Sequence, residues 1–285
     1  MTDRFMEHQI SASAPAYAAT LATLTEPQLT VELPDQPREG EPWFGYVRDA
    51  RDASLFLNLQ LNQLSSELRA LHQLSRSAEI SSQHQRAYRD LTGALAGVDE
   101  TAFDVAPDAD EWPLRRIIWH VTGAELGFSL LINWAVERQA AGDDRPITMP
   151  REEMEPHYEA YPESGSMQEV MARYEELHRN VVGDLLPLDV EQLEALNIWW
   201  EGYELPAWFR MHRFDAHLRE HTIQVDKTLA AIDRAPTEGG RLARLLHQSL
   251  ADLEILLVTA GEDGLARAAR LAAVFDERRE GLLGW

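Results

Sequence analysis

The sequence contains no cysteine among its 285 residues. Disulfide bonds, cysteine-ligated zinc and a protein thiol nucleophile are therefore excluded. It also lacks the glycine-rich loop that cradles phosphate groups and the G-x-S-x-G sequence of serine hydrolases. Catalytic chemistry in this chain has to start from other side chains, and histidine is the residue type to follow.

Positive charge is also scarce: the sequence has 26 lysine and arginine residues and 48 acidic residues, which gives a formal net charge of −22. An acidic chain without a basic run repels nucleic acid and anionic lipid, so we expect no nucleic-acid partner. No apolar run approaches the roughly 20 residues of a membrane span, so we expect no membrane partner. The first residues lack a basic stretch followed by an apolar core, so we expect no signal peptide and a cytoplasmic protein.

The fold class follows from the spacing of apolar residues, which recur every three or four positions, while no segment shows convincing strand alternation. With 45% hydrophobic residues the chain can bury a sizeable core. We predict an all-α protein. The predicted helices lie at about 46–76, 82–97, 113–140, 166–186, 207–234, 239–260 and 263–280. The aromatic segment NIWWEGYELPAWF (197–209) is expected to be a loop or a small hairpin.

These helices divide the chain into four predicted parts. We expect an extended N-terminal arm over 1–45, an additional helix over 46–79, a four-helix bundle over 80–235 and a C-terminal helical extension over 236–285. Four central helices with one long crossover after the second suggest an antiparallel bundle. The helices outside the bundle offer surface for an oligomer interface, which favours a homodimer.

The predicted crossover, residues 141–165, carries Pro146, Pro150, Pro156 and Pro162. Proline removes a backbone donor and clashes with the preceding helical turn. We therefore expect this connection to cross the bundle as irregular coil.

The stretch RFDAHLREHTIQ (213–224) places two histidines four residues apart on a predicted helix. At about 100° per residue, His217 and His221 differ by about 40° and lie one above the other. They fall at the edge of the apolar stripe that contains Leu218 and Val225, so they face a neighbouring helix.

His120 lies at one flank of the apolar stripe of helix 113–140, with Gly123 and Gly127 on the same side. Glycine costs about 1 kcal/mol relative to alanine inside a helix, so the two glycines indicate a close helix approach or space for a ligand. If the two helices are neighbours, three imidazoles form an open site suited to Zn, Ni, Fe or Cu. The residues alone leave the other interpretation open, in which these are ordinary hydrogen-bonded interior histidines.

Two segments, WPLRRIIWHV (112–121) and RFDAHLREH (213–221), resemble the second and fourth helices of the DinB-like family, which includes the mycothiol-dependent maleylpyruvate isomerase type of domain. The resemblance covers about residues 80–235. It implies a four-helix bundle with a crossover and a divalent metal, zinc or nickel above all. The metal ligands that it implies are His120, His217 and His221.

The resemblance also implies a metal-dependent enzyme that acts on a small-molecule substrate. The type is a transferase or isomerase that uses a low-molecular-weight thiol as cofactor, or a hydrolase. Arg213, one turn before His217, is the candidate for holding a substrate carboxylate, and a surface arginine paired with a carboxylate is an equally good interpretation. The rival hypothesis is a non-catalytic helical interaction protein whose metal site is structural or vestigial.

The remaining titratable candidates are weaker. Glu125 lies well round the helix from His120, and His178 and His247 have no partner at ligand spacing on their own helices. His212 lies about 140° from His217, which places it outside the same site. His157 lies in the proline-rich connection and is expected to be a surface residue.

Overall fold

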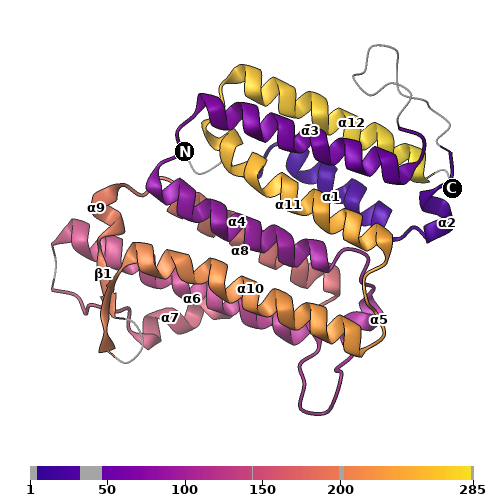
Figure 1. The fold of residues 1–285 in the computed structure, drawn as a ribbon. Coiled ribbons are helices and arrows are strands. Elements are labelled where there is room, and N and C mark those ends of the chain that lie inside the picture. Colours follow the sequence, from indigo (N-terminus) through magenta and orange to yellow (C-terminus); the bar gives the residue numbers. More distant parts are fainter. Residues whose placement is uncertain (1–4, 33–46, 143, 199–201, 284–285) are drawn as a thin grey trace. The chain divides into compact units, whose positions relative to one another are not determined.

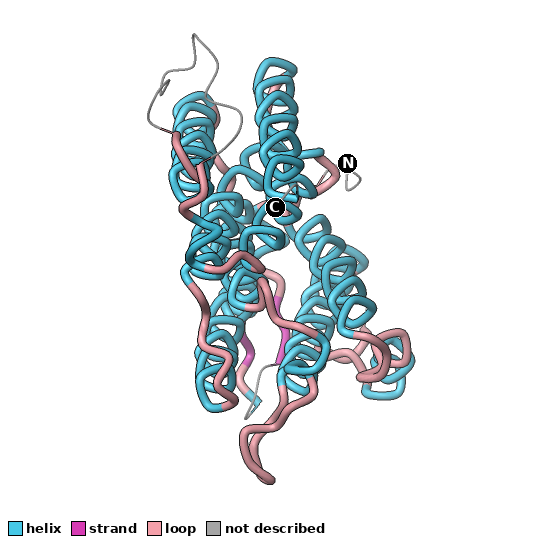
Figure 2. The backbone as a smooth tube through the Cα atoms, turned by 90° about the vertical axis from the view of Figure 1, so that its right-hand side faces the viewer, coloured by secondary structure: helices cyan, strands magenta, loops and turns pink. Residues whose placement is uncertain are grey.

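The computed structural model describes residues 5–32, 47–142, 144–198 and 202–283, and most of these residues lie in helices α1 to α12 (Figure 1; helices cyan in Figure 2). The all-α prediction is confirmed. The described helices include none that is both long and apolar enough to cross a membrane. The chain divides into two compact units, each with its own helices.

The first unit comprises residues Leu74–Tyr88 and Asp99–Ile232. Four long helices build it, and each lies close to a predicted one. They are α4 (Arg76–Ala94), whose last residues belong to the second unit, α6 (Leu114–Ala141), α8 (Met167–Leu185) and α10 (Ala207–Ala231). The short helices α5 (Glu100–Phe103), α7 (Arg151–Tyr158) and α9 (Val190–Leu193) occupy the connections. The bundle with a long crossover after its second helix is therefore present.

Local sequence signals set the ends of these helices. Ser166 caps α8 by accepting from the backbone N–H of Glu169, while the Glu169 carboxylate accepts from the N–H of Ser166. This reciprocal arrangement satisfies two donors that a helix start leaves without partners. Gly142 ends α6 in the left-handed conformation with φ of 60°, which glycine adopts without steric cost.

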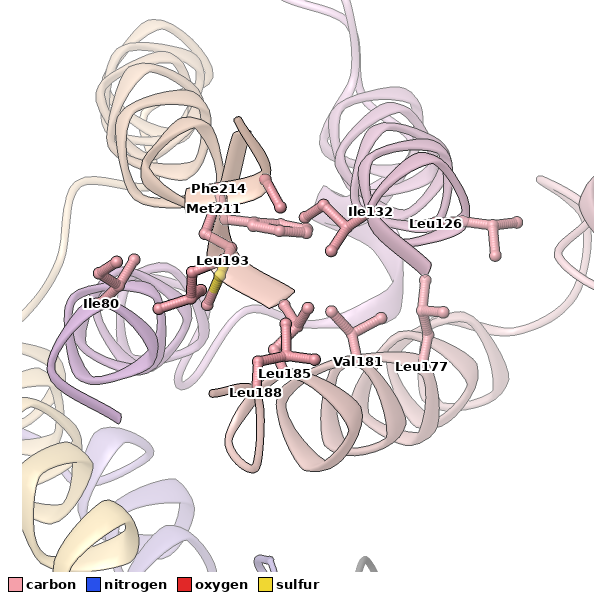
Figure 3. Packing of buried hydrophobic residues seen from close by; sticks show 11 residues of the cluster. Ile80, Leu126, Ile132, Leu177, Val181, Leu185, Leu188, Leu193, Met211 and Phe214 are labelled. Atoms are coloured by element: carbon pink, nitrogen blue, oxygen red, sulfur yellow. The ribbon is translucent and has the colours of Figure 1, made fainter. Parts of the chain in front are cut away.

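The apolar faces of these helices meet in one buried cluster (Figure 3). Side chains from α4, α6, α8, α9 and α10 converge there, among them Ile80, Ile132, Val181, Leu193 and Phe214. Burial of a large apolar side chain stabilises a fold by about 1.5–3 kcal/mol. Packing of this cluster thus holds α6 and α10 side by side, the arrangement on which the histidine site depends.

The crossover differs from its prediction, because α7 forms eight residues of helix inside the segment expected to be irregular coil. Pro150 stands at the N-cap, where a missing N–H costs nothing. Pro156 lies inside α7 but only two residues before its end, so it breaks at most one turn. The prolines rule out one continuous helix across the connection, as expected, but they permit a short one.

Two parts of the aromatic segment pair as a small antiparallel sheet, which is one of its two predicted alternatives, while residues 199–201 lie outside the described part of the chain. Strand β1 (Leu196–Ile198) pairs with β2 (Glu204–Pro206), with Asn197 opposite Leu205. The Asn197 side chain donates to the backbone oxygens of Leu131 and Ile147. This small sheet is thereby attached to α6 and to the crossover.

The second unit takes the described residues of Asp3–Gln73, Arg89–Val98 and Asp233–Trp285. Its helices are α1 (Gln9–Ala22), α2 (Glu26–Leu29), α3 (Ala50–Leu71), α11 (Glu238–Thr259) and α12 (Glu262–Leu283). Helix α1 packs against α11 and α12, and α3 packs against α11. The predicted additional helix and C-terminal extension are therefore parts of one helical unit.

The prediction of an extended N-terminal arm over 1–45 is wrong for residues 9–22 and 26–29, which are helical; residues 33–46 lie outside the described part of the chain. The buried face of α1 consists largely of alanine and serine, so its sequence shows little apolar contrast. Small side chains allow close helix contact: a Cβ on Gly239 of α11 would lie 2.4 Å from the Leu21 carbonyl oxygen. Tyr17 anchors α1 by hydrogen bonding with Ser54 at 3.1 Å.

An ion pair lies inside the second unit, where Arg89 Nε donates to Glu254 Oε2 at 2.9 Å and both side chains are almost fully buried. Removing one partner of a buried pair leaves an uncompensated charge in the interior, at a cost of about 3–5 kcal/mol. We therefore expect Glu254→Gln to lower the free energy of unfolding by about that amount, measured by chemical denaturation.

The matched control is Glu155→Gln, which breaks the exposed pair of Arg151 and Glu155. Exposed pairs contribute little, so the control should change the free energy of unfolding by less than about 0.5 kcal/mol. Equal effects of the two substitutions would show that burial of Glu254 has no special cost.

Candidate metal centre

Helix α10 carries His217 and His221 on successive turns, as the sequence predicts. His221 is buried, with 8% of its surface exposed, and His217 is half-buried. Phe214 and Leu218 lie on the buried face of the same helix. Packing of these apolar residues against the bundle turns the two imidazoles toward α6.

His120 of α6 meets both histidines. Its Nε2 atom lies 3.2 Å from His217 Nε2, and His221 Nε2 also lies 3.2 Å from His217 Nε2. The ligand atoms of the three residues all lie within 4.8 Å of one another. The structure therefore brings together all three residues that the sequence proposed as metal ligands.

Hydrogen bonds explain this convergence poorly. A neutral imidazole carries a single N–H, so a proton on His217 Nε2 can be shared with one neighbour, and the third nitrogen then faces a lone pair. Around a tetrahedral zinc ion with Zn–N bonds of roughly 2.0–2.1 Å, neighbouring ligand atoms are about 3.3 Å apart. The observed spacing of 3.2 Å is close to that value, so the three nitrogens fit a shared cation.

The protonation of the site suits metal ligation. Burial, together with the neighbouring His221 and His120 and the charge of Arg213, lowers the pKa of His217 to about 3. Burial and the nearby His221 and Arg116 also lower the pKa of His120. Metal ligation requires the neutral form of imidazole, and these two rings are neutral at neutral pH.

Outer contacts orient the rings. His221 Nδ1 lies 2.8 Å from Gln224 Oε1, so Nδ1–H donates to the amide oxygen and Nε2 keeps its lone pair for the site. A partner of this kind fixes the tautomer of metal-binding histidines. The rings of Trp112 and Phe128 flank the site, at 5.2 Å from His120 and 5.8 Å from His217 between ring centroids.

The other predicted residues have the following places. His212 lies outside the cluster, as expected, with Nδ1 at 3.1 Å from Gln83 Oε1. His157 is exposed on α7. Arg213 is half-buried and close enough to His217 for its charge to lower the pKa of that histidine. Arg213 therefore lies beside the site.

The side of α6 that carries Gly123 and Gly127 is occupied by Tyr158 of α7. A Cβ on Gly127 would lie 2.6 Å from the Tyr158 hydroxyl oxygen, and a Cβ on Gly123 would lie 3.8 Å from the ring. Of the two explanations for these glycines, a close approach is the one observed. The approaching group is an aromatic side chain of the crossover rather than another long helix.

A second cluster escaped the sequence reasoning. Glu125 is a weak candidate from the sequence, and His178 has no partner at ligand spacing on its own helix, but the structure places both beside His84 in the interior of the bundle. Each of the three comes from a different helix, so no spacing within one helix reveals them. Burial raises the pKa of the Glu125 carboxyl, but the charges of the nearby His84 and His178 and the hydrogen bond of His178 outweigh burial, so the pKa is lowered overall.

The family model described as the DinB superfamily matches residues 83–225, half of the chain. The chain belongs to the DinB superfamily. The match begins within α4 and ends within α10, so it contains both clusters and most of the bundle. No curated protein and no solved structure matches the chain.

The two glycines of the DinB domain provide a matched pair of substitutions. Alanine is favoured over glycine inside a helix by about 1 kcal/mol. We expect Gly123→Ala to raise the free energy of unfolding by about 0.5–1 kcal/mol, because the new methyl group meets Tyr158 at ordinary contact distance. Gly127→Ala should gain less or destabilise, because the Tyr158 hydroxyl has to move. Equal stabilisation by Gly123→Ala and Gly127→Ala in denaturation experiments would contradict the observed position of the Tyr158 hydroxyl against Gly127.

Proposed function

We propose that this protein is a divalent-metal-dependent enzyme that acts on a small molecule, with the metal held by His120, His217 and His221. The observation that carries the proposal is the convergence of three Nε2 atoms, in which that of His217 lies 3.2 Å from each of the other two. Three protein ligands leave a coordination position for water or substrate, which is the arrangement of catalytic rather than structural zinc. Imidazole ligands suit zinc and nickel, the two metals that we expect.

The chemistry supplied by such a metal, when bound, is a lowered pKa of a coordinated thiol or water. The chain has no cysteine, so a thiol reaction here requires a low-molecular-weight thiol from outside. We propose a transferase or isomerase that uses such a thiol, with hydrolysis as the other reaction type compatible with the same ligands.

The protein's own residues have distinct tasks in this proposal. Gln224 holds the tautomer of His221, and burial keeps His217 and His120 neutral. Trp112 and Phe128 provide apolar walls beside the ligands. Arg213 offers a guanidinium group for a carboxylate on the thiol or on the second substrate. A cytoplasmic location and a homodimer remain predictions from the sequence.

One observation favours the rival function, a helical interaction protein with a structural metal. The helices α1, α3, α11 and α12 lie outside the residues matched by the family model and form a unit of their own. A unit of this size is more than the proposed reaction needs. The two hypotheses differ in whether the metal keeps a position that an outside ligand can reach.

Metal content tests the ligand set. We expect about one equivalent of zinc or nickel to be lost from the protein in each of the variants His120→Ala, His217→Ala and His221→Ala, because two imidazoles hold a divalent ion far more weakly than three. The thermal stabilisation that added metal gives the parent should be lost as well. His212→Ala is the control and should keep both properties. Retention of full metal content by His217→Ala would refute the ligand assignment.

Access to the metal tests the enzyme hypothesis. We expect mercaptoethanol and 3-mercaptopropionate to produce a thiolate-to-cobalt absorption band in the Co(II) form of the protein. The carboxylate-bearing thiol should bind about tenfold more tightly, since a hydrogen bond to a charged group contributes about 1.5–3 kcal/mol. Arg213→Gln should remove this preference and leave the binding of mercaptoethanol unchanged. Absence of the band with both thiols would favour the structural metal of the rival hypothesis.

A further inference from the structure

The cluster of His84, Glu125 and His178 lies deeper in the bundle than the three-histidine site. The three residues come from α4, α6 and α8 and are exposed by only 1%, 2% and 0% of their surfaces. Glu125 Oε1 lies 2.8 Å from His178 Nδ1 and 3.3 Å from His84 Nε2. A carboxylate with no access to solvent requires a positive charge beside it.

His178 faces an oxygen at each ring nitrogen. Nδ1 points to Glu125 Oε1, and Nε2 lies 2.6 Å from Gln85 Oε1. A neutral imidazole has one N–H, so it can donate to one of these oxygens only. If Nε2–H donates to Gln85, the lone pair of Nδ1 is directed at the carboxylate and needs a cation between them. A metal-binding histidine normally donates its other N–H to an oxygen in this way.

His84 provides the second, independent observation. Neither of its ring nitrogens has a hydrogen-bond partner within the described part of the chain, although only 1% of the surface of the residue is exposed. Its Nε2 atom is close enough to Glu125 Oε1 for electrostatic attraction but lacks the alignment of a hydrogen bond. A buried polar atom without a partner costs about 1–3 kcal/mol, and a bound ion is one of the few explanations for it.

The position of the His84 ring is fixed by packing. The ring stacks on Phe214 with centroids 4.4 Å apart and meets the His178 ring edge-on at 4.6 Å. The distance of 3.3 Å from Nε2 to the carboxylate is the separation expected for two ligands of a tetrahedral ion, about 3.3 Å. The Tyr174 hydroxyl donates to Glu125 Oε2 at 3.2 Å, which leaves Oε1 for the ion.

We infer that His84, Glu125 and His178 form a second divalent-cation site, distinct from the three-histidine site. Two imidazoles and one carboxylate form a ligand set that zinc accepts. The ligands are closed off from solvent, so the ion at this site is structural and ties α4, α6 and α8 together. This inference does not depend on the proposed enzyme activity.

A metal-free alternative accounts for part of the geometry. If His178 carries two protons, it donates to both Glu125 and Gln85 and supplies the positive charge itself. His84 then remains a buried imidazole without a hydrogen bond and contributes nothing to charge balance. The two alternatives therefore differ in what happens when the nitrogens of His84 are removed.

The test counts zinc in the full-length protein after chelation, reconstitution with excess Zn²⁺ and gel filtration. We expect two equivalents in the parent, one in His84→Phe, one in His217→Ala and none in the double variant. Phenylalanine retains the stacking on Phe214 but has no ligand atom. His212→Ala is the matched control and should retain two equivalents. Glu125→Gln is nearly isosteric and should also lose one equivalent of zinc. It replaces His84→Phe in the experiment if that variant does not fold.

A spectroscopic measurement isolates the inner site. In His217→Ala loaded with Co(II), we expect the visible absorption of a low-symmetry cobalt site, and we expect the double variant to lack it. If the parent binds only one equivalent of zinc, and His217→Ala loses it while His84→Phe keeps it, this inference is wrong and the three-histidine site stands. If the parent binds one equivalent of zinc that His84→Phe loses and His217→Ala keeps, this inference is upheld and the three-histidine site is refuted.

Discussion

The contact between α6 and α10 is the constraint on which both clusters depend. Phe128 of α6 meets Phe214 of α10 edge-on, with ring centroids 5.5 Å apart, and Phe214 stacks against His84 on α4. An aromatic pair of this geometry contributes about 0.5–1.5 kcal/mol beyond the area that it buries. Because His217 follows Phe214 by one turn, this packing fixes which part of α6 the paired histidines face.

The paired histidines of the outer cluster could be predicted from the sequence because their spacing lies within one helix. His217 and His221 share one helix face at a spacing that any helix translates into adjacency. Placing His120 opposite them required the helix order of a known family, since periodicity says which face of α6 is buried but not which helix covers it. The inner cluster has no such signal: His84, Glu125 and His178 are 41 and 53 residues apart in sequence and become neighbours only through the packing of three helices.

The errors in the fold predicted from the sequence also have specific causes. Periodicity detects a helix by contrast between apolar and polar positions, and α1 buries Ser11, Ser13, Ala14 and Ala18, which provide little contrast. The prolines of the crossover do not forbid every helix there, because proline is excluded only from positions whose N–H a helix needs. Both helices exist because of tertiary partners: α1 packs on α11 and α12, and α7 seats Tyr158 against the glycines of α6.

The two clusters solve the burial of titratable groups in opposite ways. The outer cluster is made of imidazoles alone, and burial keeps His120 and His217 neutral, so their lone pairs can bind a cation with no carboxylate among the ligands. The inner cluster contains a carboxylate whose pKa is lowered although burial opposes its ionisation. A neutral ligand set leaves a bound divalent ion with its full charge, whereas a set with a carboxylate partly neutralises the ion. Both sets have three protein ligands, so the proposed reactive site and the inferred structural one differ mainly in burial, which is complete only for the inner cluster.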